Sequence, residues 1–149
     1  MNTHTYALPD PQTQPEFYAD VPVKRLMAWF ADMVLIGIIC FAISIFTLGI
    51  GFLLWVFLTL IVGFIYRVVT LANGSATWGM RFVGIEMRTQ DGARFELSHA
   101  FLHTLGYSVS LSFPVLQIIS IVLMLTSARS QGLTDHVMGT VAINRAARF

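Results

Sequence analysis

Charged side chains are scarce in this sequence. Only 11% of the 149 residues are Asp, Glu, Lys or Arg, whereas 56% are hydrophobic. A soluble domain carries about 25% charged residues, so this chain has too little charge to cover a water-facing surface. The composition therefore predicts an integral membrane protein, and the length fits one domain.

Basic clusters are also missing. The 9 Lys and Arg residues are spread along the chain, and the formal net charge is +1. A protein that binds nucleic acid usually concentrates its basic side chains on one face or stripe. We therefore expect no nucleic-acid partner.

Cysteine is nearly absent, since Cys40 is the single one in the chain. One thiol cannot form an internal disulfide, and its place in an apolar stretch predicts a small, inert filler of the interior. Cysteine usage therefore excludes a disulfide framework and gives no information on the redox compartment.

Familiar catalytic motifs are absent as well. The sequence contains no HExxH, no GxSxG, no CxxC and no glycine-rich phosphate loop. Each of these patterns places a nucleophile, a metal ligand or a phosphate cradle at a fixed spacing. We therefore expect no enzyme and no cofactor.

The N-terminal stretch is polar and rich in proline. Four prolines fall within residues 1–24, and no apolar period is visible there. Such a composition buries too little apolar surface to fold by itself. We expect residues 1–20 to form a disordered tail.

Two long apolar stretches follow the tail. Residues 26–47 are interrupted only by Asp32 and Ser44, and residues 52–71 form the second stretch with Arg67 near its end. A membrane-spanning helix needs about 20 such residues. The pattern predicts a helical hairpin with a short glycine-bearing link at residues 48–51, and we expect Arg67 to reach toward the interface.

A third apolar region covers residues 100–127 and contains no fully charged side chain. It fits one tilted span kinked at Pro114, or two half-length helices that turn at Phe113 and Pro114. Each half would be about 21 Å long, shorter than a bilayer core of about 30 Å. Three crossings would divide the Lys and Arg residues between the two sides, whereas a re-entrant hairpin or an even number of crossings keeps all nine on one side. The positive-inside rule therefore favours both termini in the cytoplasm.

Residues 73–97 have a different pattern. Ile85, Met87 and Thr89 alternate with polar residues, and Asp91-Gly92 follows. Asp-Gly after such an alternation predicts a β-hairpin, because both turn positions tolerate positive φ. An amphipathic interfacial segment is the alternative. Residues 140–143 have strand propensity and could add to the edge of this hairpin.

Asp32 is an acid within the first predicted span. At a helix centre an Asp is unfavourable by about 2.5 to 3.5 kcal/mol, so it should face a protein interior or a water cavity. Arg25 lies on the same helix face, about 10 Å away along the axis. Two interpretations stay open: Asp32 bridges neighbouring helices, accepting from an Arg or from backbone N–H groups, or it is a titratable site on an ion or proton route.

Polar residues also form a stripe in the third apolar region. His99, His103, Ser110 and Gln117 recur at spacings of four and seven residues. Two His residues at i, i+4 can bind a metal ion, but no third ligand follows at a recognisable spacing. We therefore expect no metal site and interpret the stripe as a helix face turned to the protein interior or the interface.

Several of these residues match a known pattern. Arg25 and Asp32 in the first helix, together with Asp135 near the end, resemble the RDD family of small bacterial membrane proteins, named for one arginine and two aspartates. The segment "SATWGMRFVGIEMR" is similar to the family's stretch after the second helix, and "QGLTDHVMGTVAI" is similar to its closing segment. The matching positions in these two segments are Gly79, Arg81, Asp135, Gly139 and Thr140.

The resemblance covers residues 21–144 and leaves 145–149 as a C-terminal tail. It implies a functional polar cluster of Arg25, Asp32 and Asp135, with secondary candidates at Arg81, His103 and His136. The polar stripe adds His99 as a further secondary candidate. His103 and His136 stand where the family often has a basic residue, which makes a pH-dependent role conceivable. Transport of ions or small ligands has been suggested for some members.

The expected fold is an all-α membrane protein, with a helical hairpin, a third kinked or hairpin apolar region and a small cytoplasmic β-hairpin. Two functions remain open: transport of an ion or small ligand, or a non-transporting accessory or assembly subunit of a larger complex. Because a few short helices enclose little pathway, we expect a homo-oligomer or a larger complex in the lipid bilayer. The expected location is the bacterial inner membrane, as a multi-pass protein.

Overall fold

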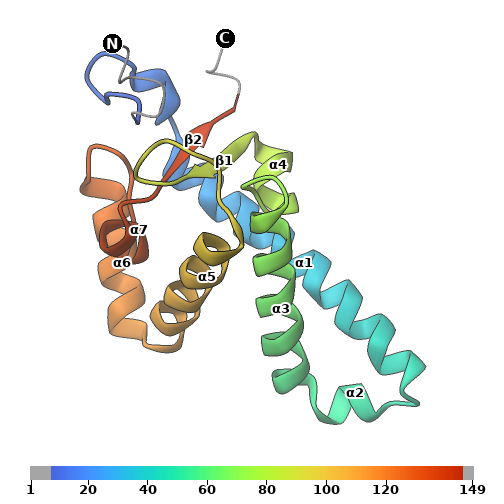
Figure 1. Ribbon diagram of the computed structural model, residues 1–149. Coiled ribbons are helices and arrows are strands. Elements are labelled where there is room, and N and C mark those ends of the chain that lie inside the picture. The colour runs from blue at the N-terminus through green and yellow to red at the C-terminus, as the bar shows by residue number, and fades with distance from the viewer. Residues whose placement is uncertain (1–7, 146–149) are drawn as a thin grey trace.

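The computed structural model describes residues 8–145 and shows a mostly helical protein with a small antiparallel sheet at one end (Figure 1). This confirms the predicted helical membrane fold. In chain order the elements are the 3-10 helix η1 (Pro15–Phe17), α1 (Val21–Phe46), α2 (Ile50–Leu53), α3 (Trp55–Ala72), α4 (Trp78–Val83), β1 (Ile85–Arg88), α5 (Leu97–Ser112), α6 (Pro114–Thr126), α7 (Leu133–Met138) and β2 (Val141–Asn144).

α1 and α3 are the two helices long and apolar enough to cross a membrane. α1 has 26 residues and α3 has 18, which gives lengths of about 39 and 27 Å at 1.5 Å per residue. Figure 1 shows them projecting together away from the sheet, joined at the far end by the single turn of α2. They form the predicted hairpin.

The third apolar region is two short helices rather than one straight span. α5 and α6 meet at an angle of 116°, because Phe113 has extended backbone and Pro114 begins α6. Proline lacks the N–H that would continue the preceding helix, and it disfavours helical backbone in the residue before it. With 16 and 13 residues, the two helices reach about 24 and 20 Å, so each is shorter than a bilayer core.

The small sheet differs from the prediction. β1 pairs antiparallel with β2, with Ile85 opposite Asn144 and Arg88 opposite Val141. A small antiparallel sheet is therefore present as predicted, but its second strand is the 141–144 segment, which was expected at the edge, and not the residues after the Asp-Gly turn. The Asp-Gly turn does form, since Thr89 N–H donates to the Ala93 carbonyl at 2.8 Å. Beyond the turn, however, Phe95 N–H donates to Ser75 Oγ, which leads the chain away from β1 and into α5. The 141–144 segment supplies the partner strand.

Residues 8–20 also differ from the disordered tail that the composition predicts. Tyr18 is buried with Val141 and Ile143 of β2, and its hydroxyl donates to the Pro9 carbonyl at 2.7 Å. Asn144 Nδ2 donates to the Glu16 and Ala19 carbonyls at 2.9 and 2.8 Å. A partner strand distant in sequence therefore gives this polar segment the contacts that its own composition lacks. Residues 1–7 of the predicted tail, and most of the predicted C-terminal tail, lie outside the described residues.

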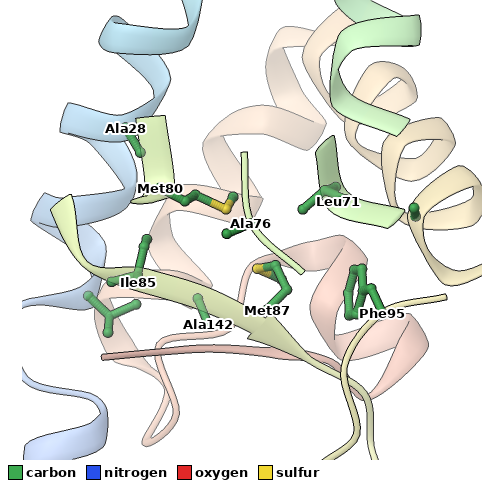
Figure 2. Packing of buried hydrophobic residues seen from close by; sticks show 10 residues of the cluster. Ala28, Leu71, Ala76, Met80, Ile85, Met87, Phe95 and Ala142 are labelled. Atoms are coloured by element: carbon green, nitrogen blue, oxygen red, sulfur yellow. The ribbon is translucent and has the colours of Figure 1, made fainter. Parts of the chain in front are cut away.

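The main apolar core lies between the sheet and the helix ends nearest to it. Figure 2 shows its labelled members, which come from α1, α3, α4, both strands and the loops between them: Ala28, Leu71, Ala76, Met80, Ile85, Met87, Phe95 and Ala142. We call this end of the molecule the cap, defined as residues 8–20, 73–96 and 127–145. The cap fixes the positions of α1, α3 and α5 at the level where the charged residues lie.

Charge is strongly segregated along the helices. No Asp, Glu, Lys or Arg occurs between Asp32 and Arg67, or between Glu96 and Arg129. These uncharged intervals contain the far ends of the α1–α3 hairpin and the whole α5–α6 pair. The basic side chains among the described residues therefore lie in the cap or in the helix turns nearest to it.

Candidate functional site

Asp32 is buried and accepts three hydrogen bonds from neutral donors. Its Oδ1 accepts from the Tyr66 hydroxyl at 2.6 Å and from Gly79 N–H at 2.8 Å, and its Oδ2 accepts from Thr77 Oγ1 at 2.7 Å. No ion pair joins Asp32 to a Lys or Arg in the part of the chain that the structure describes. Asp32 thus ties α1 to α3 and α4 through hydroxyl and backbone groups, so of the two partners considered from the sequence it has the backbone N–H and not the Arg.

Gly79 makes this approach possible. A Cβ atom at position 79 would lie only 2.7 Å from Asp32 Oδ1 and would also meet the backbone oxygen of Ala28. Thr77 caps the start of α4, where its side chain accepts from Met80 N–H. The N–H groups of a first helical turn have no partner within the helix, so Gly79 N–H is available to the carboxylate.

Asp135 is the centre of a second cluster. Its Oδ2 receives the Arg25 guanidinium at 2.5 Å, and its Oδ1 lies 2.7 Å from His103 Nε2. Because a carboxylate only accepts, His103 Nε2 carries the hydrogen of that bond. Thr140 Oγ1 and Gly132 N–H complete the set at 2.7 and 3.1 Å. Four donors therefore hold Asp135, and they connect α1, α5 and α7.

The Asp135 carboxyl is buried, and burial by itself raises its pKa. The positive field of Arg25 and the hydrogen bond from His103 outweigh burial and hold the pKa well below its usual range. The carboxylate is therefore charged at neutral pH, as an ion pair with Arg25 requires.

We expected Arg67 to reach toward the membrane interface, but its side chain is buried inside the protein. Its side chain is 9% exposed, and its guanidinium lies over the Tyr107 ring at 4.1 Å from the ring centre. The Tyr107 hydroxyl accepts from Trp29 Nε1 at 2.7 Å, which fixes the ring beneath the cation. Arg67 Nε has no hydrogen-bond partner among the described residues.

The two acids share one cavity. A cavity of about 520 Å³ lies between α1, α5, α6 and α7, and a second of about 300 Å³ lies on the α3 side of Asp32 and Arg67. The polar stripe predicted in the third apolar region contributes to the larger cavity, where Ser110 Oγ donates to Gln117 Oε1. The charged or titratable side chains that line the larger cavity are Arg25, Asp32, Arg67, His103 and Asp135.

Three of the secondary candidates lie elsewhere. Arg81 donates to the Thr70 and Asn73 carbonyls at the end of α3 and to the Ala76 carbonyl, so it closes the C-terminus of that helix. His99 packs on the Phe95 ring. His136 is exposed and bonds through Nδ1 to the Gly132 carbonyl of its own helix. Their functional role stays a prediction, and none of the three lines the cavity.

The groups available at the site favour charge and hydrogen bonding over metal chemistry. Among residues 8–145, no three His, Cys, Asp or Glu side chains come together in a way that could hold a metal ion. What the cavity offers instead is a pair of guanidinium groups, an imidazole and several hydroxyl and amide groups against apolar walls.

The sequence predicted Arg25, Asp32 and Asp135 as site residues, but not the residues that contact Asp32 and Arg67. Tyr66, Thr77 and Tyr107 were not recognised, because hydroxyl-bearing residues are common at helix ends and give no distinctive pattern. The signal for Arg67 was present, since an ionisable residue inside a span is a candidate functional residue by default. Its nearness to the end of the helix favoured an interfacial role instead.

Comparison with protein families gives one finding. A family model described as the RDD family matches residues 20–139, which is most of the chain. The range includes Arg25, Asp32 and Asp135, as the resemblance implies. Comparison with curated proteins found no match, and comparison with solved structures found none either. The protein therefore belongs to the RDD family, whose members are small membrane proteins.

Proposed function

We propose that this protein takes part in moving an ion or a small ligand across the membrane, and that the cavity between α1, α5, α6 and α7 is the binding site. The observation that carries the proposal is the cavity itself, which reaches Asp32 and is lined by Arg25, Arg67, His103 and Asp135. Ionisable groups at membrane depth are unfavourable unless they face a bundle interior or a water-filled space. Asp32 and Arg67 lie within α1 and α3 and line one cavity together with Arg25, His103 and Asp135, and this arrangement points to a ligand route.

The broken third region supports the same proposal. Many transporters place their substrate near discontinuous helices, because unpaired backbone at a helix break is tolerated where it lines a cavity. Here the break at Phe113 lies between Ser110 and Gln117, both of which line the cavity.

The alternative function, a non-transporting accessory subunit, has less support. Helices that dock in membranes use small residues at their contact face. The most exposed apolar residues of the α1–α3 hairpin are large instead, including Phe46, Leu48 and Leu53 at 87, 94 and 85% exposure. Such a surface fits lipid tails.

We further propose a homo-oligomer or a larger membrane complex, since a single cavity of this size does not by itself form a path through a bilayer.

We also propose a membrane topology. The basic residues lie at the cap level, and cytoplasmic flanks are enriched in Lys and Arg. The cap should therefore face the cytoplasm of a bacterial inner membrane, with both termini on that side and α5–α6 as a re-entrant hairpin. A cysteine at exposed position 13 should react with an impermeant thiol reagent only in inverted vesicles.

The test of the proposal uses single-cysteine proteins in sealed vesicles. Cys40 is buried, and a Cys40→Ala background leaves Ser110→Cys, on the cavity wall, as the reporter. A transport site must be reachable from both aqueous sides in turn, so an impermeant reagent should label this cysteine in right-side-out and in inverted vesicles. Val34→Cys is the matched control, because Val34 is 62% exposed on the apolar surface of α1 and should stay unlabelled.

Labelling of Ser110→Cys from one side only would reject transport and favour the accessory function. Failure of the reagent to label it from either side would reject the cavity as an aqueous binding site.

A further inference from the structure

Arg67 is a buried cation without a counter-ion in contact. In the described part of the chain, no hydrogen bond or ion pair joins its guanidinium to another group, and its close contact is the Tyr107 ring. A buried charge is strongly unfavourable unless it is paired and hydrogen-bonded. Because Arg67 lines both cavities, an anion within the larger cavity can approach it.

The carboxylates near Arg67 are already engaged. Asp32 accepts three hydrogen bonds and Asp135 accepts four. A carboxylate has about four lone-pair sites, so Asp135 is saturated and Asp32 keeps about one site for a new donor. A cation that enters the cavity would therefore find at most one open site, on Asp32, whereas an anion would find the guanidinium donors of Arg67, which make no hydrogen bond within the described part of the chain.

The cavity wall also has an apolar part, which continues onto the exposed apolar surface of α1 and α6. Val23 and Leu26 of α1 line the cavity and are 58 and 56% exposed, and Ile121 and Leu125 of α6 line it and are 45 and 67% exposed. Residues that are both lining and exposed mark an opening, so the cavity opens between α1 and α6. That opening lies on the apolar side of the molecule, where lipid tails are the surrounding solvent.

We propose that the cavity takes an anionic membrane lipid, with the headgroup phosphate on Arg67 and an acyl chain between α1 and α6. This inference rests on the proposed function in that it names the ligand class of the same cavity. Guanidinium groups bind phosphate through two parallel hydrogen bonds. A zwitterionic headgroup such as ethanolamine is less favoured, because its ammonium group carries three donors and the two carboxylates together leave about one open site, on Asp32.

The test compares lipids on the purified protein in neutral detergent, with binding measured by native mass spectrometry. Wild type should retain phosphatidylglycerol about tenfold better than phosphatidylethanolamine of the same chain length, and Arg67→Gln should lose that preference by about tenfold, since the lost contacts are charge-assisted. The matched control is Arg94→Gln, which removes an exposed arginine of the cap and should bind as wild type does. Equal binding of phosphatidylglycerol to wild type and Arg67→Gln would overturn the proposal.

Two further measurements test the lipid site without relying on the Arg67 variant. A photoreactive phosphatidylglycerol on the wild-type protein needs no variant, and its crosslinks should map to residues 23–29 and 121–125. Crosslinks confined to other segments would overturn the proposal. Inorganic phosphate should neither displace the lipid at millimolar concentration nor raise the unfolding temperature, and if it did both, the site would be an anion site without a lipid.

The outcome is separable from that of the transport test. Two-sided labelling of Ser110→Cys without Arg67-dependent lipid binding would overturn the lipid and keep transport. Arg67-dependent lipid binding with one-sided labelling would overturn transport and keep the lipid site.

Discussion

At the scale of single residues, the structure shows how an acid is kept inside a membrane helix bundle without a basic partner. In place of water, Asp32 accepts hydrogen bonds from the Tyr66 hydroxyl, Thr77 Oγ1 and the Gly79 amide. Hydrogen bonds to a charged acceptor contribute about 1.5 to 3 kcal/mol each, more than neutral ones. The carboxylate is therefore both a functional candidate and the joint between α1, α3 and α4.

Gly79 gives the first residue-scale prediction. Gly79→Ala should destabilise the protein by about 1 to 3 kcal/mol, as overpacking does, because the new methyl group meets a backbone oxygen and the Asp32 carboxylate. The measurement is thermal unfolding in detergent. Gly37→Ala is the control. Gly37 lies in α1, the helix that carries Asp32, and no atom lies within 4 Å of its added methyl group. That variant should be neutral or slightly stabilised, and an equal loss in both variants would count against the close contact at Gly79.

Asp135 gives a prediction for pH dependence. Its pKa in the folded protein lies below that of the unfolded chain, so the unfolded state binds the proton first in acid. The Asp135 contribution to stability is therefore present at neutral pH and is lost as the pH falls below about 4. The unfolding temperature of wild type should drop over that range, and Asp135→Asn should show a lower temperature at neutral pH and a weaker dependence on acid. Asp91→Asn, at an exposed turn, should keep the wild-type slope; identical slopes for wild type and Asp135→Asn would refute the assignment.

At the scale of elements, the two halves of the chain differ in how far sequence predicts them. The α1–α3 hairpin follows from composition alone, since two apolar stretches of about 20 residues, each with few polar residues, are best satisfied as helices in a bilayer. The α5–α6 pair was predicted only as one of two options, because Pro114 allows either a kink or a reversal. The sheet could not be predicted in full, because β1 and β2 are separated by more than fifty residues and a strand pattern does not identify its partner.

The contact between the N-terminal segment and β2 gives the prediction at this scale. Asn144 holds residues 8–20 through bonds to the Glu16 and Ala19 carbonyls, and its Oδ1 accepts from Lys24 Nζ at 2.7 Å. Asn144→Ala should therefore free this segment and speed its cleavage by a protease several-fold, while the helices stay intact. Asn73→Ala is the control, because the Asn73 side chain donates to the Val69 carbonyl of its own helix and does not contact the N-terminal segment. Equal cleavage of wild type and Asn144→Ala would show that Tyr18 alone anchors the segment.

At the scale of the whole molecule, the cap brings residues far apart in sequence to one level of the bundle. Arg25 and Asp135 are 110 positions apart and form an ion pair, a contact that the helix periodicity of either segment could not reveal. The periodicity did place Arg25 and Asp32 on one helix face, which suggested a single cluster. The structure separates them into two clusters that line one cavity. Asp32 accepts from neutral donors that include Gly79 of α4, whereas Arg25 pairs with Asp135 of α7.

Double-mutant cycles on the free energy of unfolding test this two-cluster site most directly. Arg25→Ala and Asp135→Ala should be strongly coupled, by about 2 kcal/mol or more, since each leaves the other as an unpaired buried charge. Arg25→Ala and Asp32→Ala should be additive within about 0.5 kcal/mol, because the two side chains do not touch. Strong coupling between Arg25 and Asp32, with additivity between Arg25 and Asp135, would contradict the arrangement described for this site.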